Sequence, residues 1–279
     1  MKEWQRLRRS EVLGVRFVAE PFEVVRNAVA VTLRDDARNA VYLCPTGVHG
    51  TIEAHKDPHF RDILNGAAFN VADGMPIVRV SRMLGFASAE RAFGPEIMRA
   101  IIQDSAASGA RHFFYGGGPG VAKHLGEVLS ESYPGIQVAG SYRPPFRPLT
   151  QEERREVVEM VNATRADVVW VGLSTPKQER WIADFRDELD VKLICSVGAA
   201  FDYHTGSIRP APNWMKTASL EWLFRLLQEP RRLWRRYLDI IPRFLFLVTL
   251  QIAGHGPYSK RKAAGRSDLE SGDSSTLKR

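Results

Sequence analysis

Apolar runs alternate with amphipathic segments over most of the chain. Short runs rich in Val, Ile, Leu and aromatic residues are typical of buried strands, and the segments between them repeat apolar positions at helical spacing. The predicted strands cover residues 29–33, 41–44, a run ending at 72, 112–115, 136–140, 168–173 and 193–197. Amphipathic segments include 95–107, 121–129, 151–163 and 181–189. This pattern predicts an α/β fold, a Rossmann-like parallel sheet with helices on both faces.

The pattern changes at both ends of the chain. Residues 1–20 are polar and poorly patterned, which predicts a flexible lead-in before an α/β domain over 21–209. Aromatic and basic helical segments follow over 210–254 and predict a C-terminal helical appendage that associates with a membrane. Residues 255–279 are rich in Ser, Gly and Lys, which predicts a disordered tail.

Composition narrows the class of protein. A hydrophobic share of 44% excludes a wholly disordered chain, and a net charge of +7 indicates an anionic partner such as nucleic acid, nucleotide phosphates or an acidic membrane. Cys44 and Cys195 both lie in apolar runs, which argues against a disulfide framework and fits a reducing cytosolic setting. We expect no signal peptide, and no run reaches the roughly 20 apolar residues that span a bilayer.

A carboxylate follows the apolar run that ends at residue 72. Asp73-Gly74 is typical of a strand that ends in a tight turn, and Met75-Pro76 opens a helix because proline suits the first helical turn. In an open α/β sheet, a side chain at the carboxyl end of a strand faces the crevice where ligands bind. Asp73 is therefore the candidate catalytic residue. The alternative is that Asp73 only caps the helix that begins near Met75.

A glycine-rich loop connects a predicted strand to a predicted helix. Gly116, Gly117 and Gly118 offer backbone N–H groups beside a helix N-terminus, where a phosphate would bind. The loop lacks the dinucleotide fingerprint, because Val121 follows Gly118 three residues later and no acidic residue closes the next strand. We therefore expect no NAD. A tight turn that needs glycine for close helix packing is an equally supported interpretation.

A third strand end carries Lys177, Gln178 and Glu179, which begin another helix. Lys177 suits a phosphate, and Gln178 suits a sugar hydroxyl. Such residues are common at helix starts, so this segment alone is a weak signal. Together with Asp73 and the glycine loop it places polar groups at three strand ends, as a binding crevice requires.

The basic C-terminal segment permits several interpretations. Its arginines, which include Arg225, Arg232 and Arg235, lie among aromatic and apolar residues. That mixture is typical of an interfacial helix attracted to anionic lipid, although a solvated face on a packed helix is also consistent with it. We find no nucleic-acid-binding module, and the seven histidines show no metal-ligand spacing, so neither nucleic acid nor a metal is expected.

Six ordered motifs carry a resemblance to a known family. They are residues 72–76 (ADGMP), 116–122 (GGGPGVA), 176–179 (PKQE), 198–202 (GAAFD), 209–212 (RPAP) and 220–225 (LEWLFR). The chain resembles the WecG/TagA/CpsF family of bacterial glycosyltransferases over roughly residues 40 to 240, and six motifs in order are far more specific than one.

The resemblance implies an enzyme of cell-surface polysaccharide biosynthesis. It implies transfer of an N-acetylmannosamine-type sugar from a UDP-sugar to a polyprenyl-diphosphate-linked sugar, peripherally at the inner face of the cell membrane, without metal or other cofactor. It also implies that Asp73 is the general base and that Gln178 lies in the active-site pocket. Arg225, Arg232 and Arg235 are implied to meet the lipid diphosphate.

The chain departs from the family pattern at two places. The usual Thr-x-Asn is replaced by Pro45 and Gly47, with Thr46 and His49 as candidate substitutes, and Gly94-Pro95-Glu96 replaces Gly-Thr-Asp. These changes bear on sugar specificity rather than on the class of reaction. A UDP-sugar epimerase and a non-catalytic scaffold of polysaccharide assembly remain alternatives. The sequence identifies neither the sugars nor the oligomeric state, a homo-oligomer included.

Overall fold

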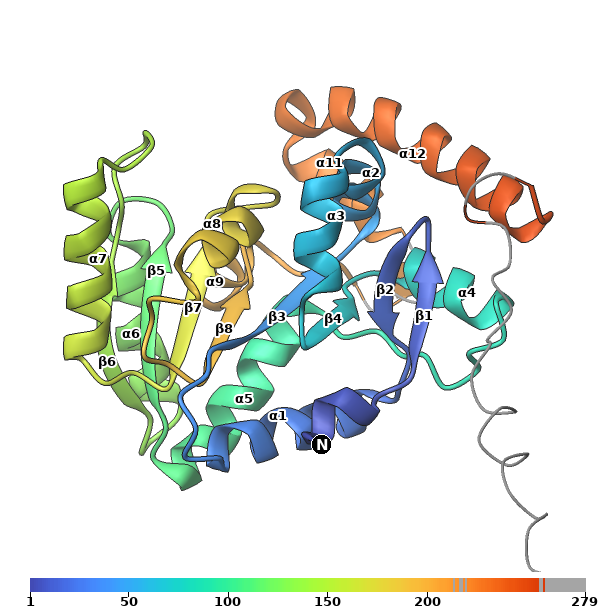
Figure 1. The fold of residues 1–279 in the computed structure, drawn as a ribbon. Helices are drawn as coiled ribbons and strands as arrows, with labels where there is room; N and C mark the ends of the chain where they lie inside the picture. The colour runs from blue at the N-terminus through green and yellow to red at the C-terminus, as the bar shows by residue number, and fades with distance from the viewer. Residues whose placement is uncertain (213, 216–217, 219, 256–257, 259–279) are drawn as a thin grey trace, which may run out of the picture.

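An eight-stranded sheet runs through the computed structural model in the order β1-β2-β4-β3-β8-β7-β5-β6 (Figure 1). The strands are β1 Arg9–Val12, β2 Val15–Val18, β3 Val41–Thr46, β4 Phe69–Ala72, β5 Arg111–Gly116, β6 Gln137–Tyr142, β7 Val168–Gly172 and β8 Leu193–Ser196. The structure describes residues 1–212, 214–215, 218, 220–255 and 258, without the side chain of Arg232.

Helices connect and cover the strands. Those of the first half are η1 Glu3–Arg6, α1 Phe22–Arg34, α2 Val48–Lys56, α3 Pro58–Asn65, α4 Met75–Met83 and α5 Gly94–Ser108. Those of the second half are α6 Val121–Ser132, α7 Gln151–Ala163, α8 Lys177–Phe185, α9 Ala200–His204, α11 Glu221–Gln228 and α12 Pro230–Ile252.

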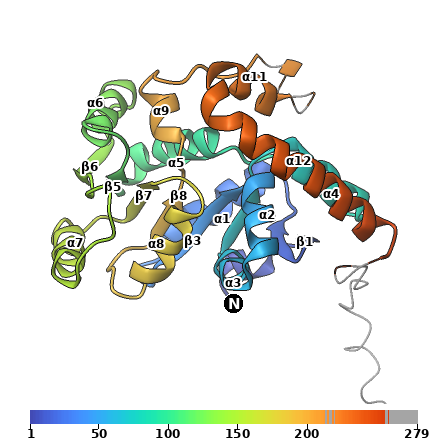
Figure 2. The ribbon, with the colours of Figure 1, turned by 90° about the horizontal axis from the view of Figure 1, so that it is seen from above.

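Every neighbouring pair from β2 to β6 is parallel, and only β1 is antiparallel to its neighbour β2. Successive side chains of a strand enter opposite cores: Leu43 belongs to one apolar cluster and Cys44 to the other. The cluster of Cys44 includes residues of α2, α3, α4, α7 and α8, and the cluster of Leu43 includes residues of α1, α5, α6 and α9. Figure 2 shows α5, α6 and α9 on one side of the sheet and α7 and α8 on the other. The predicted α/β sheet with helices on both faces is confirmed.

Two predicted elements differ from the structure. The strand predicted over residues 29–33 is wrong, because this segment is the second half of α1, whose buried positions Val25, Ala28 and Val29 share one helical face. Part of the predicted flexible lead-in instead forms the β1–β2 hairpin at the edge of the sheet. Leu13 and Gly14 turn this hairpin with φ of 51° and 82°, a tight turn with left-handed backbone at both positions.

The C-terminal helix α12 lies across the end of the molecule opposite to α1 (Figure 1). The Lys56 side chain of α2 pairs with Asp239 at 3.1 Å, and Gln251 bonds the Leu13 N–H and the Glu11 carbonyl of the hairpin. The inward positions of α12 are Leu233, Ile240, Phe244 and Val248. Within the described residues, no helix is both long and apolar enough to cross a membrane. The predicted domain boundaries stay predictions, and the predicted tail lies outside the described residues except for His255 and Tyr258.

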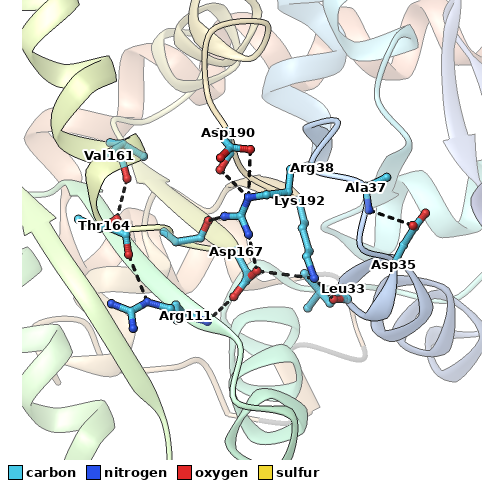
Figure 3. A network of polar contacts seen from close by, with 11 residues as sticks. Leu33, Asp35, Ala37, Arg38, Arg111, Val161, Thr164, Asp167, Asp190 and Lys192 are labelled. Atoms are coloured by element: carbon cyan, nitrogen blue, oxygen red, sulfur yellow. Dashed lines mark hydrogen bonds and ion pairs between the residues drawn. The ribbon is translucent and has the colours of Figure 1, made fainter.

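A polar network ties together the amino-terminal edge of the sheet (Figure 3). Arg38 donates to the Ala166 and Asp190 carbonyls and pairs with the carboxylates of Asp167 and Asp190. Asp167 also accepts a hydrogen bond, at 2.9 Å, from the backbone N–H of Arg111, which is the first residue of β5. Because Arg38, Asp167 and Asp190 precede β3, β7 and β8 and Arg111 begins β5, the network fixes the starts of four strands and leaves their opposite ends for the site.

Candidate active site

The carboxyl ends of the strands form the edge at which the predicted site residues lie. After β3 the chain continues to β4 on one side, whereas β8 is reached from β7 on the other side. Helix α2 follows β3 and packs in one apolar cluster, whereas α9 follows β8 and packs in the other, so the chain leaves these neighbouring strands toward opposite faces of the sheet. Such a divergence in a parallel sheet is where ligands bind.

Asp73 stands directly after β4 at this edge. Its N–H donates to the Thr46 carbonyl at 3.2 Å, and its Oδ1 accepts the N–H of Gly94 at 3.0 Å. Helix α4 has Gly74 at its N-cap and no side-chain cap. The interpretation in which Asp73 only caps the helix at Met75 is therefore wrong, because the carboxylate is bound at the start of α5.

Burial raises the pKa of Asp73 to about 6. The Gly94 N–H and the guanidinium groups of Arg91 and Arg225 oppose this rise, whereas the Glu221 carboxylate adds to it. A carboxyl group with a pKa near 6 is mostly ionised at pH 7 and is more basic than an exposed aspartate. Those properties suit a general base.

Arg91 is a site residue that the sequence analysis missed. Its Nε donates to the Asp73 carbonyl at 3.0 Å, and its Nη2 lies 2.7 Å from an oxygen of Glu221, the first residue of α11. Its guanidinium also lies over the Phe93 ring, 4.3 Å from the centroid. The only sequence signal was a positive charge three residues before the altered Gly94-Pro95-Glu96 segment.

The loop after β3 borders Asp73. Thr46 is buried, and its hydroxyl donates to the Cys44 carbonyl of its own strand at 3.5 Å. A Cβ on Gly47 would lie 3.9 Å from Asp73 Oδ2, and a Cβ on Gly94 would lie 3.8 Å from the Pro45 ring. The departures from Thr-x-Asn therefore surround the Asp73 carboxylate, and Gly47 leaves space beside Oδ2.

Gln178 and Glu179 form a buried pair in the first turn of α8, with exposed fractions of 3% and 1%. The Gln178 amide donates to Glu179 Oε1 at 2.9 Å, and the Thr175 hydroxyl donates to the same oxygen. Gln178 Oε1 is buried beside Gly198, which follows β8, and has no hydrogen-bond partner among the residues that the structure describes. Burial raises the pKa of Glu179, against the effect of these hydrogen bonds. Glu179 thus holds the Gln178 amide in place.

The Lys177 side chain extends toward the loop after β6, away from the Gln178–Glu179 pair. It is exposed, and its ammonium lies 4.9 Å from the centroid of the Phe146 ring, in the proline-rich loop after β6. The structure therefore brings Lys177 to this loop rather than to Gln178.

Close packing accounts for two glycines of the predicted phosphate loop. A Cβ on Gly116 would lie 2.6 Å from the Gly172 carbonyl oxygen of β7, and one on Gly117 would lie 3.1 Å from Val121. Both glycines also have positive φ, of 110° and 75°. The packing interpretation therefore explains their residue type, and phosphate binding by this loop stays a prediction.

The three predicted arginines separate. Arg225 on α11 is close enough to Asp73 and Tyr203 to oppose the rise in pKa that burial causes in both, and its guanidinium lies 4.0 Å from Glu229. Arg235 on α12 is exposed, and its guanidinium lies 5.2 Å from the Trp234 ring centroid. The side chain of Arg232 lies outside the described part of the structure.

The predicted residues thus form two groups at the carboxyl ends of the strands. Thr46, Asp73 and Gln178 lie near the ends of β3, β4 and β8, and the glycine loop follows β5. Thr46 and Thr175 meet at Gly50 of α2, where a Cβ would lie 2.8 Å from Thr46 and 3.6 Å from Thr175, so this glycine joins the ends of β3 and β7. With neighbouring strands about 4.8 Å apart, the ends of β4 and β8 are separated by roughly 10 Å, and those of β4 and β5 by roughly 19 Å. Asp73 therefore lies nearer to Gln178 than to the glycine loop.

Among the described residues, no group of three or more His, Cys, Asp or Glu side chains is placed to hold a metal ion. A cavity of about 500 Å³ lies at the opposite edge of the sheet, lined in part by Lys2, Arg38 and Arg186. These cations pair with Asp35, Asp190 and Asp187, respectively, and the cavity includes none of the predicted site residues.

Comparison with known proteins gives concordant matches. Residues 10–257 match the glycosyl transferase WecG/TagA/CpsF family. The chain is 31% identical over 196 residues to N-acetylglucosaminyldiphosphoundecaprenol N-acetyl-beta-D-mannosaminyltransferase of Bacillus spizizenii, covering 70% of this chain and 74% of the relative. It is 30% identical to the protein of the same name from Bacillus subtilis, covering 70% and 73%.

Proposed function

The chain belongs to the WecG/TagA/CpsF family of glycosyltransferases, and we propose that it transfers an N-acetylmannosamine-type sugar from a UDP-sugar to a polyprenyl-diphosphate-linked sugar. The named relatives act on a diphosphoundecaprenol-linked N-acetylglucosamine, which supports this acceptor class. The observation that carries the proposal is the Asp73 carboxylate, held at the carboxyl edge of the sheet with a pKa of about 6.

Asp73 acts as the general base in this mechanism. Its Oδ1 is held by Gly94, and Oδ2 lies beside the space at Gly47, where an acceptor hydroxyl would bind. The hydroxyl proton passes to the carboxylate while the hydroxyl oxygen forms a bond to the anomeric carbon. The bond from that carbon to the diphosphate breaks, and UDP leaves with the bonding electrons. One such displacement inverts the anomeric configuration.

Positive charge around Asp73 suits a diphosphate. Arg225 is near the carboxylate and would bind the acceptor diphosphate, since guanidinium groups form strong paired hydrogen bonds to phosphate oxygens. The first-turn N–H groups of α6 and the exposed Lys177 remain candidates for the donor diphosphate. Gln178 remains a candidate for a sugar hydroxyl.

The outer side of α12 suits an anionic membrane surface. Four large apolar side chains are exposed there: Trp234, Leu238, Leu245 and Phe246. Arg231 and Arg235 are exposed on the same helix. Exposed apolar and aromatic groups beside arginines favour insertion at a lipid headgroup layer over a purely solvated face. We propose that this surface brings the site to its lipid acceptor, in the biosynthesis of a cell-surface polysaccharide.

One assay tests the proposed reaction against its alternatives. Anionic vesicles that carry a polyprenyl-diphosphate N-acetylglucosamine are incubated with the protein and a panel of UDP-sugars, and UDP release and product mass are measured. We expect acceptor-dependent UDP release with an N-acetylmannosamine-type donor. Conversion of a UDP-sugar without acceptor would instead indicate an epimerase. Vesicle binding with neither binding nor consumption of any UDP-sugar would indicate a scaffold.

A further inference from the structure

A chain of contacts connects Asp73 to helix α11. Arg91 Nε donates to the Asp73 carbonyl at 3.0 Å, and Arg91 Nη2 lies 2.9 and 2.7 Å from the two oxygens of Glu221. Glu221 begins α11 and is 130 residues from Arg91 in the sequence. One guanidinium is therefore shared by the backbone of the candidate base and the first turn of α11.

The surroundings hold Arg91 in this position. Its guanidinium lies over the Phe93 ring, and that ring packs edge-on against Tyr203 of α9 with centroids 5.4 Å apart. The side chains of Arg91 and Glu221 are only 12% and 21% exposed. An ion pair this sheltered is screened less by water and salt than a surface pair, and loss of one partner leaves the other charge poorly compensated.

Helical geometry carries the effect of this pair to Arg225. Glu221 and Arg225 are four residues apart on α11, so their side chains lie on the same face, one turn apart. The Arg225 guanidinium is close enough to Asp73 and Tyr203 to oppose the rise in pKa that burial causes in both groups. Its Nη2 also lies 4.0 Å from Glu229 Oε2, one turn further along α11. Anchoring Glu221 at Arg91 therefore fixes the position of Arg225, which lies on the same face of α11 one turn from the Arg91–Glu221 pair.

We propose that Glu221 is a positioning residue, which docks α11 against the Asp73 loop through Arg91 and thereby places Arg225 at the active site. This inference rests on the proposed function, in which Arg225 binds the acceptor diphosphate. Glu221 itself touches neither donor nor acceptor. Without the pair, Asp73 keeps its hydrogen bond to Gly94, but Arg225 loses its alignment with the acceptor.

A double-mutant cycle in the full-length protein tests this dependence. Glu221→Gln, Arg225→Gln and the double variant are assayed with the vesicle-bound acceptor. We expect Glu221→Gln to lower kcat/KM for the acceptor roughly 10- to 100-fold, mainly through KM, because a small misplacement of a binding group is costly. The double variant should be within about twofold of Arg225→Gln alone, because effects that act through one contact do not add. Glu127→Gln on α6, an exposed glutamate paired with Lys123, is the matched control.

Hydrogen exchange gives a second readout that does not depend on activity. In Glu221→Gln, amides of residues 221–228 should exchange faster, while those of β3 and β4 keep their protection. Independent, multiplying effects in the cycle would overturn the proposal, as would wild-type kinetics of Glu221→Gln or unchanged exchange in α11. An inactive wild-type protein with the expected exchange result would contradict the proposed function but leave the docking role of Glu221 standing.

Discussion

The backbone N–H of Gly94 holds one oxygen of the Asp73 carboxylate, with 3.0 Å between the nitrogen and Oδ1. Because Gly94 is the first residue of α5, the carboxylate also lies at the positive end of that helix. Burial nevertheless raises the pKa of Asp73 to about 6. One oxygen is thus fixed in place, and the other is available on the side of Gly47.

Replacing the carboxylate tests its role as a base. Asp73→Asn keeps an oxygen that accepts the Gly94 N–H but cannot take a proton, so we expect kcat to fall by ~10²–10⁴-fold. UDP binding should be retained, as measured by calorimetry. Asp36→Asn, at an exposed loop position, is the control and should match the wild type. Full activity of Asp73→Asn would remove Asp73 from the mechanism.

The pH dependence of the reaction should report the same group. With a pKa of about 6 for Asp73, kcat/KM should fall tenfold per pH unit below about pH 6, as the free enzyme loses its ionised base. The measurement is a profile of kcat/KM from pH 4.5 to 8.5 with the vesicle-bound acceptor. A limb near pH 4, typical of an exposed aspartate, would contradict the assigned environment.

The same pKa predicts a stability effect of opposite sign to the activity effect. The pKa of Asp73 is raised in the folded state from 3.8 to about 6, so its contribution to stability is present below pH 4 and is lost as the pH rises through 6. The Asp73→Asn variant does not lose this stability, because asparagine does not ionise as the pH rises. At pH 8 it should be more stable than the wild type by about 1–3 kcal/mol, and the difference should shrink toward pH 4. Urea unfolding at both pH values measures it, and an equal difference at both would argue against the raised pKa.

Two arginines that looked equivalent in the sequence should differ in function. Arg225 lies near Asp73, so Arg225→Gln should raise the apparent KM for the lipid acceptor while vesicle binding stays intact. Arg235 is exposed on α12 beside Trp234, so Arg235→Gln should weaken binding to anionic vesicles, by about 1 kcal/mol. Vesicle sedimentation and acceptor kinetics measure the two effects separately. If both variants changed the acceptor KM and vesicle binding to the same extent, the separate roles assigned to Arg225 and Arg235 would be contradicted.

The sequence pattern correctly predicted the strands that are buried on both faces in the core. The runs at 112–115, 168–173 and 193–197 consist mostly of apolar residues because both faces of these strands are buried. Asp73 was located for the same reason, since a carboxylate directly after a buried strand must lie at its carboxyl end. The β-branched run at 29–33 misled because strand propensity is weak against tertiary packing, here of α1 on α5.

Relationships between distant residues were beyond the sequence. Whether Asp73 caps the next helix or another one depends on which N–H groups the fold brings near, and Gly94 is 21 residues away. The Arg91–Glu221 pair joins residues 130 positions apart and has no local pattern. The edge hairpin was likewise hidden, because Arg9, Glu11 and Arg16 interrupt its apolar positions and its strands have only four residues each.

The network at the amino-terminal edge should support the fold without contributing to the reaction. Arg38 is largely sheltered and joins Asp167, Asp190 and the Ala166 carbonyl (Figure 3). These residues lie at the starts of the strands, whereas Asp73 follows the end of β4. Arg38→Ala leaves these acceptors short of a donor, so we expect a loss of about 2–3 kcal/mol in the free energy of unfolding, because hydrogen bonds to charged groups are among the stronger ones. Urea unfolding measures this loss, with Lys123→Ala, at a highly exposed position of α6, as the control that should change by less than about 0.5 kcal/mol.

Activity distinguishes this structural role from a catalytic one. At a temperature where Arg38→Ala is fully folded, its kcat and acceptor KM should equal those of the wild type, because the network fixes the starts of the strands and the site lies at their ends. A variant that unfolds as easily as expected but also loses turnover while folded would show that strain at one edge of the sheet reaches Asp73 at the other. A variant of unchanged stability would mean that Lys192, 3.7 Å from Asp167, suffices to compensate that carboxylate.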